Sequence, residues 1–425
     1  MVFSQALMLA IFCVSYYFIL SGRFKSSVMV FLMGLIVAFM KIVEDMSLEN
    51  LSQFIDFNTI GLLAGMMIIV GLLKSTGFFQ FVAVYAVKMG RGDIRKTLSL
   101  IVISIALLSA FLDNVTTILI FAPILLFISD TVGIDAKYLM VTGIIASNLG
   151  GASTMIGDPP NIIIGSASKL SFNSFIIHLA PVCILILMLM LFIWFRKMNS
   201  DESMREKIKK LATTDPKSAI IDKKKMIALL FVFLGVIFGF ALHEVLDYEM
   251  ALISMAGATI ALVIYGKSFE EAAKEVEWDT LFFLIGLFMI TYAMRKVGLI
   301  DYLTNVISKV HSPIILMTTL IWLSGILAMF LSAVPTVIIM IPVVQTLLLM
   351  GFTPVIWWAL SLGASLGANG TTIGAAVNIV GVSLLGKYGG GTVRFVSYMK
   401  RAAPITLLML LIANIYVIFI YLTGW

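Results

Sequence analysis

The chain has 425 residues, of which 61% are hydrophobic and 12% are charged, and its mean hydropathy is +1.08. A water-soluble protein does not need this much apolar sequence to build its core. Apolar stretches of about 20 residues, enough to cross a hydrocarbon layer of ~30 Å, recur from end to end. The sequence therefore predicts an all-α polytopic protein in the lipid bilayer of the cell inner (plasma) membrane.

The same composition disfavours other classes of protein. Cys13 and Cys183 lie in separate apolar segments without a CxxC or Cys/His spacing, so neither a disulfide nor a metal site is predicted. The sequence contains no nucleophile–base pair or phosphate-binding loop typical of an enzyme, and nothing in it supports nucleic-acid binding. The net charge of +6 lies mostly in loops, where it indicates orientation across the membrane.

The two halves of the chain repeat each other. Thr59, Gly65 and Gly77 fall on Thr280, Gly286 and Gly298 at a shift of 221 residues. Residues 111–123 fall on 330–342 at a shift of 219, and residues 149–162 fall on 366–379 at a shift of 217, with seven of fourteen positions identical. Chance similarity between apolar helices does not align glycines, a threonine and an asparagine in one order. The sequence therefore predicts a duplicated fold.

We expect two repeats of about five spans each, and the odd number makes the second repeat inverted relative to the first. Ten Lys and Arg residues between Arg196 and Lys225 mark residues 199–225 as a cytoplasmic linker. The N-terminal repeat, 1–198, has a scaffold over 1–96 (spans near 4–20, 27–44 and 59–76), a re-entrant hairpin at 97–131, a broken helix at 138–165 and a span at 174–195. The C-terminal repeat, 226–425, has a scaffold over 226–312 (spans near 226–243, 249–266 and 279–297), a hairpin at 313–350, a broken helix at 353–388 and a span at 402–423.

This count also assigns a side to each loop. The acidic loop with Glu44 and Asp45 lies outside, together with both termini. Arg295, Lys296 and Lys309 then face outward as well, against the general preference of basic residues for the cytoplasm.

Each predicted hairpin has a polar tip. In the first half the tip runs from Asp113 to Thr117, between apolar arms that are each too short to span alone. Asp, Asn and Thr side chains at this tip can cap the N-terminus of the second arm. In the second half the matching residues run from Ser332 to Thr336, where Ser332 could cap the helix and Pro335 could open it.

Each predicted broken helix has an unwound, glycine-rich stretch. In the first half, residues 157–161 (Gly-Asp-Pro-Pro-Asn) predict a break at which Asp158 caps a new half-helix with proline in its first turn. Such breaks offer carbonyl groups to a cation and positive helix ends to an anion. Close helix packing is the alternative explanation for these small residues, but packing does not call for Asp-Pro-Pro-Asn.

Asp113 and Asp158 are the carboxylates that we expect at membrane depth, where an ionisable group indicates function. They could carry protons, or bind Na⁺ when ionised; the alternative is that they only cap helices. Neither tip nor unwound stretch contains Arg, Lys or His, which disfavours a multiply charged, citrate-like substrate. A cation exchanged for protons fits these residues, as does a small neutral hydroxy-acid.

At these motifs the chain resembles the ion transporter superfamily, in the branch with the ArsB arsenite permeases, the melanosomal P protein and the NhaD Na⁺/H⁺ antiporters. The similar segments are FLDNVTTILIFAPI at the first tip and SNLGGASTMIGDPPNIIIG in the first broken helix. The resemblance covers essentially the whole chain and implies an elevator-type transporter, in which hairpins and broken helices move against a scaffold. Related symporters suggest a homodimer formed through the scaffold, and an ArsB-like protein would have a soluble ATPase as partner.

In related dicarboxylate/Na⁺ symporters, Ser-Asn-Thr tips and the loops of the broken helices form the cation and substrate sites. The second half departs from this pattern, because residues 332–334 lack the Asn and Thr, and Ala-Ala-Val at 375–377 replaces Asp-Pro-Pro. The predicted substrate- and ion-binding residues are Asp113, Asn114, Thr116, Thr117, Asn148, Gly150, Gly151, Thr154, Asp158, Asn161, Ser332, Thr336, Asn369, Thr371, Thr372 and Asn378. Asp113 and Asp158 are predicted to couple transport to protons; no metal ligand or cofactor is expected beyond H⁺ or Na⁺ as coupling ion.

The first functional hypothesis is proton-coupled efflux of a small inorganic solute, arsenite or antimonite, as the ArsB-like resemblance implies. No cysteine lies near the predicted site, so recognition would use hydrogen bonds rather than thiolate–arsenic bonds. Na⁺/H⁺ antiport is the alternative, followed by Na⁺-coupled dicarboxylate or other anion transport. A channel is the competing class, since re-entrant tips also build pores.

Overall fold

The computed structural model describes residues 2–21, 24–196, 202–211, 215–388 and 391–425, and every regular element in these residues is helical. Seven of the described helices are at least 18 residues long and apolar enough to cross a membrane. They are α4 (Phe57–Lys74), α7 (Asn114–Val132), α10 (Phe172–Phe195), α12 (Lys223–Leu246), α15 (Trp278–Lys296), α17 (Pro313–Leu331) and α21 (Phe395–Thr423). The prediction of an all-helical, multi-pass membrane protein is confirmed.

The remaining helices complete the fold. In the first half they are α1 (Val2–Ser21), α2 (Ser26–Phe39), η1 (Leu48–Asn50), α3 (Leu51–Phe54), α5 (Phe78–Met89), α6 (Ile94–Ser109), α8 (Ala136–Gly151) and α9 (Pro159–Ser168). Between the halves lie α11 (Glu202–Leu211) and η2 (Pro216–Ala219). The second half adds α13 (Met250–Tyr265), α14 (Phe269–Ala272), α16 (Leu299–Ile307), α18 (Ala333–Leu349), α19 (Ile356–Gly367), η3 (Ala368–Gly370) and α20 (Ala376–Lys387).

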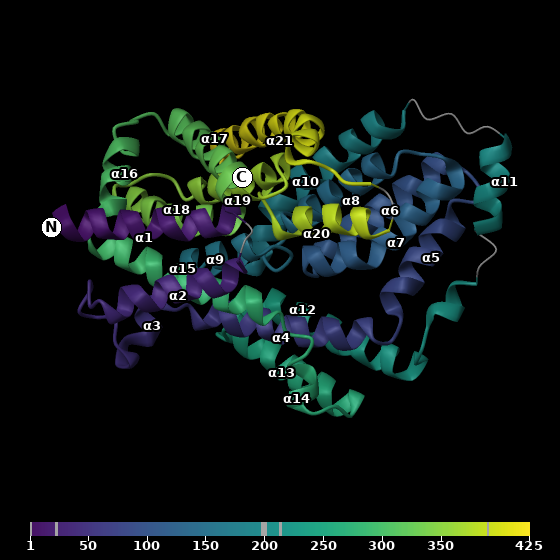
Figure 1. Ribbon diagram of the computed structural model, residues 1–425, viewed down its shortest axis with the longest axis horizontal. Coiled ribbons are helices and arrows are strands. Elements are labelled where there is room, and N and C mark those ends of the chain that lie inside the picture. The colour runs from purple at the N-terminus through teal and green to yellow at the C-terminus, as the bar shows by residue number, and fades with distance from the viewer. Residues whose placement is uncertain (1, 22–23, 197–201, 212–214, 389–390) are drawn as a thin grey trace.

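The helices form two packed groups. In one group α2 packs against α15 and α4 packs against α13; in the other, α6 and α7 pack against α8, and α17 and α21 pack against α19. Figure 1 shows α2, α4 and α13 along one side of the molecule and α17, α19 and α21 along the other. The repeat aligns α4 with α15 and α2 with α13, so the two contacts of the first group are equivalent to each other. We call this first group the scaffold.

Glycines at repeated positions bring the helices into close contact. A Cβ atom at Gly65 would lie 2.7 Å from the backbone of Ser254 in α13, and one at its repeat partner Gly286 would lie 2.7 Å from the backbone of Phe31 in α2. Small residues let helix backbones approach in lipid, where no hydrophobic force holds helices together. These glycines therefore fix the scaffold.

The ion pairs agree with the predicted sides of the loops. Lys296 Nζ lies 2.7 Å from Asp45 Oδ2, which joins two residues that were both predicted outside. Figure 1 shows α3 and α16 at one end of the long axis and α5 and α11 at the other. Lys296, which was predicted outside against the positive-inside rule, therefore has an acidic partner on the same side.

The longest described helices that were not predicted are α5, α11 and α16. Helices α5 and α16 are short and follow Gly77 and Gly298, whose φ angles of 86° and 83° suit glycine. Within the predicted solvated linker, α11 packs against α6 and α7 and buries Ile208 completely. The linker is thus partly folded onto the first hairpin; residues 199–201 and 212–214 of it lie outside the described part of the chain.

Candidate functional site

The first hairpin tip is the turn between α6 and α7. Asp113 is the N-cap of α7, and its carboxylate accepts a hydrogen bond from the Thr116 backbone N–H at 2.8 Å. The Thr117 hydroxyl donates to the Asp113 carbonyl at 3.0 Å. The predicted capping of the second arm is confirmed, and it leaves the Asp113 carboxylate at the end of the tip.

The first broken helix is interrupted between the end of α8 at Gly151 and the start of α9 at Pro159. Asn161 holds the break in shape, because its Nδ2 donates to the carbonyls of Ala152 at 3.2 Å and Thr154 at 2.9 Å. The Thr154 hydroxyl donates to the carbonyl of Ala110 at the hairpin tip. Buried backbone groups at the break therefore find partners within the protein, as they must in lipid.

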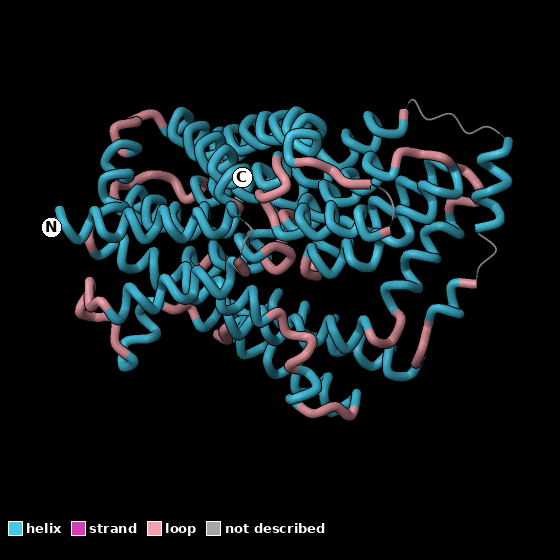
Figure 2. The backbone as a smooth tube through the Cα atoms, in the orientation of Figure 1, coloured by secondary structure: helices cyan, strands magenta, loops and turns pink. Residues whose placement is uncertain are grey.

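The second half repeats these bonds. Asn378 Nδ2 donates to the carbonyls of Ala368 at 2.8 Å and Thr371 at 2.7 Å, and the Thr371 hydroxyl donates to Met329 at 2.5 Å. Figure 2 shows such loop segments among the helices in the interior of the molecule. The aligned threonines and asparagines of the two halves thus hold the two breaks with equivalent hydrogen bonds.

The second tip differs from the first. Ser332 has a φ of 73° and its side chain makes no capping hydrogen bond, so the prediction that Ser332 caps α18 was wrong. Two other hydrogen bonds hold the tip. The Ala333 backbone N–H donates to the Gly374 carbonyl at 3.1 Å, and the Thr336 hydroxyl donates to the Ser332 carbonyl at 2.8 Å. Thr372 is partly exposed in the neighbouring unwound segment.

A buried polar network joins the first tip to both broken helices. Asn114 Nδ2 donates to Asp158 Oδ1 at 3.2 Å, while Asn148 Nδ2 donates to the side-chain oxygens of Asn369 and Asn378, each at 2.9 Å. All five side chains are at most 9% exposed. Asp158 makes no capping bond to α9, so its predicted role as a cap was wrong; its carboxylate faces Asn114 instead.

The two predicted glycines of the first broken helix lie against neighbouring elements. A Cβ atom at Gly150 would lie 2.7 Å from Cα of Ala106 in α6, and one at Gly151 would lie 2.9 Å from Asn114 Nδ2. Gly150 thus permits close helix packing, and Gly151 makes room for the Asn114 amide. Close helix packing therefore accounts for Gly150, and the polar network accounts for Gly151.

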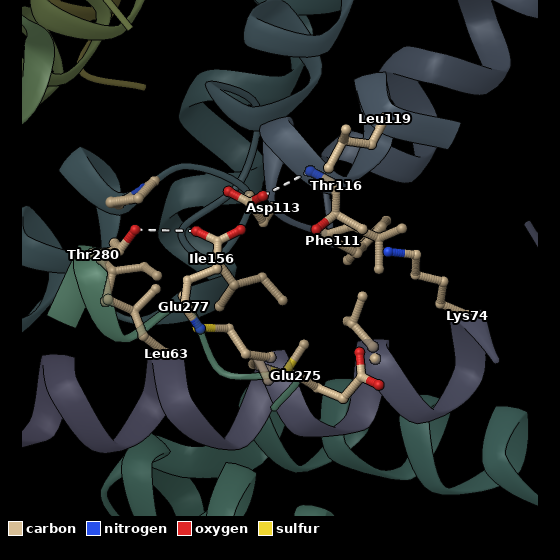
Figure 3. A pocket seen from close by; sticks show the side chains of 18 of the residues that line it. Leu63, Lys74, Phe111, Asp113, Thr116, Leu119, Ile156, Glu275, Glu277 and Thr280 are labelled. Atoms are coloured by element: carbon tan, nitrogen blue, oxygen red, sulfur yellow. Dashed lines mark hydrogen bonds between the residues drawn. The ribbon is translucent and has the colours of Figure 1, made fainter. Parts of the chain in front are cut away.

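A cavity of about 210 Å³ lies between the first tip, the first break and the scaffold. Figure 3 shows Asp113 and Thr116 facing this cavity from the tip, with Glu277 and Thr280 opposite them. Of the predicted residues only Asp113 and Thr116 line it. The structure therefore separates the predicted set into two residues at the cavity and a larger group that supports the tip and the breaks.

Glu277 is a site residue that the sequence analysis missed. It is the N-cap of α15, and its Oε2 accepts a hydrogen bond from the Thr280 hydroxyl at 3.0 Å. The prediction of two interior carboxylates was therefore incomplete. A signal was present: extending the repeat alignment three residues upstream of Thr59 and Thr280 pairs Asp56 with Glu277, each an acid three residues before a threonine.

Basic residues also reach the cavity, although none belongs to a tip or a break. Lys74 from the end of α4 and Lys274 from the loop before α15 line the wall, together with Glu275. The lining thus holds three carboxylates and two ammonium groups. No group of three or more metal-ligating side chains occurs among the residues that the structure describes. The chemistry available is proton exchange, cation binding and hydrogen bonding to a small polar solute.

Membrane-spanning helices with unwound segments around a small polar cavity define a multi-pass secondary transporter. Residues 16–363 match the citrate transporter (CitMHS) family, and the chain belongs to this family.

The chain is similar to known proteins over most of its length. It is 35% identical over 368 residues to an uncharacterized transporter of Mycobacterium tuberculosis, covering 85% of this chain and 86% of that one. It is 27% identical to the mouse P protein, covering 89% of this chain and 56% of that one. The fold is similar to the YdaH transporter of Alcanivorax borkumensis, with a TM-score of 0.61, 15% identity, and coverage of 87% of this chain and 86% of that one.

Proposed function

We propose that the protein is a proton-coupled exporter of a small neutral oxyacid, with arsenite or antimonite as the first candidates. The observation that carries this proposal is the size and chemistry of the cavity: about 210 Å³, with Asp113 and Glu277 beside the hydroxyl-bearing Thr116 and Thr280. Arsenous acid is neutral at pH 7 and needs only hydrogen-bonding groups. The ArsB-like motifs at the tip and the break favour the same solute.

The coupling role is assigned to Asp113 and Asp158. Asp113 lies at the cavity, whereas Asp158 lies behind it and is bonded to Asn114. Protonation of Asp158 would remove its negative charge and so weaken the bond from Asn114 that holds the tip on the break. A proton can thereby change the geometry of the tip without touching the solute.

We propose an elevator-type movement of two inverted repeats, 1–198 and 226–425, joined by the linker 199–225. In this proposal the hairpins 97–131 and 313–350 and the broken helices 138–165 and 353–388 move as one unit against the scaffold. An asymmetry between equivalent half-helices supports it. Both half-helices pack on helices of the other repeat, α9 on α18 and α19 and α20 on α7 and α8, but α9 also packs on scaffold helix α4, whereas α20 leaves Ile379 53% exposed. Repeats that occupy unequal positions fit one end state of alternating access.

Two alternatives each have an observation in their favour. The facing carboxylates Asp113 and Glu277 suit a bound cation, which favours Na⁺/H⁺ antiport. Lys74 and Lys274 at the same cavity suit a carboxylate substrate, which favours Na⁺-coupled dicarboxylate transport and agrees with the description of the family. A homodimer through the scaffold and a soluble ATPase partner stay predictions.

Arsenite accumulation in proteoliposomes under an imposed pH gradient tests this proposal. Elemental analysis of the washed vesicles should show arsenite inside vesicles with the wild-type protein and background levels with Asp113→Asn or in protein-free vesicles. Equal levels in all three would reject arsenite as the solute.

A further inference from the structure

Asp113 and Glu277 are two carboxylates that reach one cavity from different parts of the fold. Asp113 belongs to the first hairpin and Glu277 to scaffold helix α15; Figure 3 shows both side chains directed into the space between these parts. Because both carboxylates line one cavity of about 210 Å³, ionising both places two negative charges in it. One proton bound by either carboxylate would remove one of these two charges and with it the repulsion.

Other charged groups around Asp113 and Glu277 only partly neutralise the negative charge of these two carboxylates. Lys74 of α4 and Lys274 face the cavity, but Glu275 lies beside them. Asp279, in the first turn of α15, accepts hydrogen bonds from Lys25 at 3.1 Å and from Ser27 at 2.7 Å. From the break, the Asp158 carboxylate accepts a hydrogen bond from Asn114, the residue after Asp113. The neighbouring charges therefore do not neutralise Asp113 and Glu277 when both are ionised, and a bound proton is still favoured.

The repeat shows that this pair cannot recur at the other end of the scaffold. Glu277 corresponds to Asp56, and Asp113 corresponds to Ser332. Asp56 accepts hydrogen bonds from the Thr59 hydroxyl at 2.6 Å and from two backbone N–H groups at 3.1 Å. A cavity of about 330 Å³ separates Asp56 from Pro342 and Gln345, well along α18 from its tip. After the proposed movement Asp56 would face Ser332, which has no carboxylate.

We propose that Asp113 and Glu277 form one proton-binding site, divided between the moving hairpin and the scaffold, which exists only in the end state seen here. This inference rests on the proposed elevator movement. Binding one proton stabilises this end state, and losing it drives the hairpin away from α15 by charge repulsion. Glu277 thereby couples the proton to the movement itself, a role distinct from that of Asp158.

A distance measurement across the two parts tests the inference without any solute. Spin labels are placed at two exposed positions, Lys96→Cys at the start of hairpin helix α6 and Glu270→Cys in α14, which contacts scaffold helix α4. In a protein with Cys13 and Cys183 replaced, they report the separation of the first hairpin from the scaffold. Pulsed electron resonance on liposomes should give the present separation at mildly acidic pH and a second separation as the major population at mildly alkaline pH. Glu277→Gln and Asp113→Asn should keep the present separation at both.

Two further variants keep this experiment decisive. Glu277→Asp retains a carboxylate and should retain the pH-dependent shift, which shows that the ionisable group rather than the length of the side chain is measured. Glu244→Gln removes an exposed acid from a separate cavity of about 550 Å³ and should shift as the wild type does. A wild-type distance that ignores pH, or a shift that persists in Glu277→Gln, overturns the inference. A shift lost in Glu277→Gln while arsenite transport is absent upholds the pair and rejects only the solute.

Discussion

The side-chain nitrogen of Asn148, in the first broken helix, donates a hydrogen bond to the side-chain oxygen of Asn378, in the second, at 2.9 Å. The same nitrogen donates to Asn369 at 2.9 Å. Asn378 in turn holds the second break through two backbone carbonyls. One amide thus joins the two breaks, which is the connection that a rigid moving unit requires.

Asn148→Ala should destabilise the protein. The substitution leaves two buried oxygens without donors, and each costs about 1–3 kcal/mol. The unfolding temperature in detergent should fall by several degrees, whereas Asn305→Ala, at an exposed position of α16, should leave it unchanged. Equal unfolding temperatures for the two variants would show that the Asn148 bonds do not hold the breaks together.

Gly367→Ala should also destabilise the fold. An added Cβ atom would lie 2.5 Å from Cα of Gly325, so α19 and α17 would have to move apart, at a cost of about 1–3 kcal/mol. Gly235→Ala in α12 is the matched control, because its Cβ atom would meet nothing within 4 Å. Thermal unfolding of both variants measures the difference; a stable Gly367→Ala protein would contradict the close contact.

Lys74→Gln separates a neutral solute from an anionic one. If the solute is neutral, its KM should change by less than about threefold, because only screened charge–dipole effects are lost. A dicarboxylate would lose a charge-assisted bond at the cavity, and its KM should rise about tenfold or more. Initial rates of uptake with each solute measure this, with Lys96→Gln, a substitution at the exposed start of α6, as the control. A large rise for arsenite would count against recognition of the neutral acid.

The orientation of the loops can be tested by cysteine labelling. Asp45→Cys and Lys296→Cys, in a protein with Cys13 replaced, should react with an impermeant maleimide from one side of sealed vesicles. Lys25→Cys and Asp279→Cys, at the opposite ends of α2 and α15, should react from the other side. Labelling of Asp45→Cys and Lys296→Cys from different sides would contradict both the ion pair and the predicted span count.

The broken helices and hairpins could be predicted because their signals are local. Glycine, proline and polar residues inside an apolar segment interrupt a helix wherever that segment packs, and the repeat supplied each break with a second copy. The Asn161 and Asn378 clamps, aligned at a shift of 217 residues, show how closely the copies agree.

Other features depend on contacts between distant segments. Asp158 precedes two prolines, which is typical of a helix cap, but its carboxylate instead accepts a hydrogen bond from Asn114 of the hairpin. Glu277 resembles an ordinary scaffold cap in sequence, and only the position of the first tip across the cavity makes Glu277 a site residue. Short α5 and α16 carry too few residues for a span and so escaped a count based on spans.

The measurement that tests the account most directly is proton flux in proteoliposomes, reported by an internal pH dye as arsenite, antimonite and Na⁺ are added in turn. Asp113→Asn and Asp158→Asn are measured alongside the wild type. The account predicts flux with the two metalloids in the wild-type protein and its loss in either variant. Flux with Na⁺ alone, or undiminished metalloid flux in both variants, would contradict it.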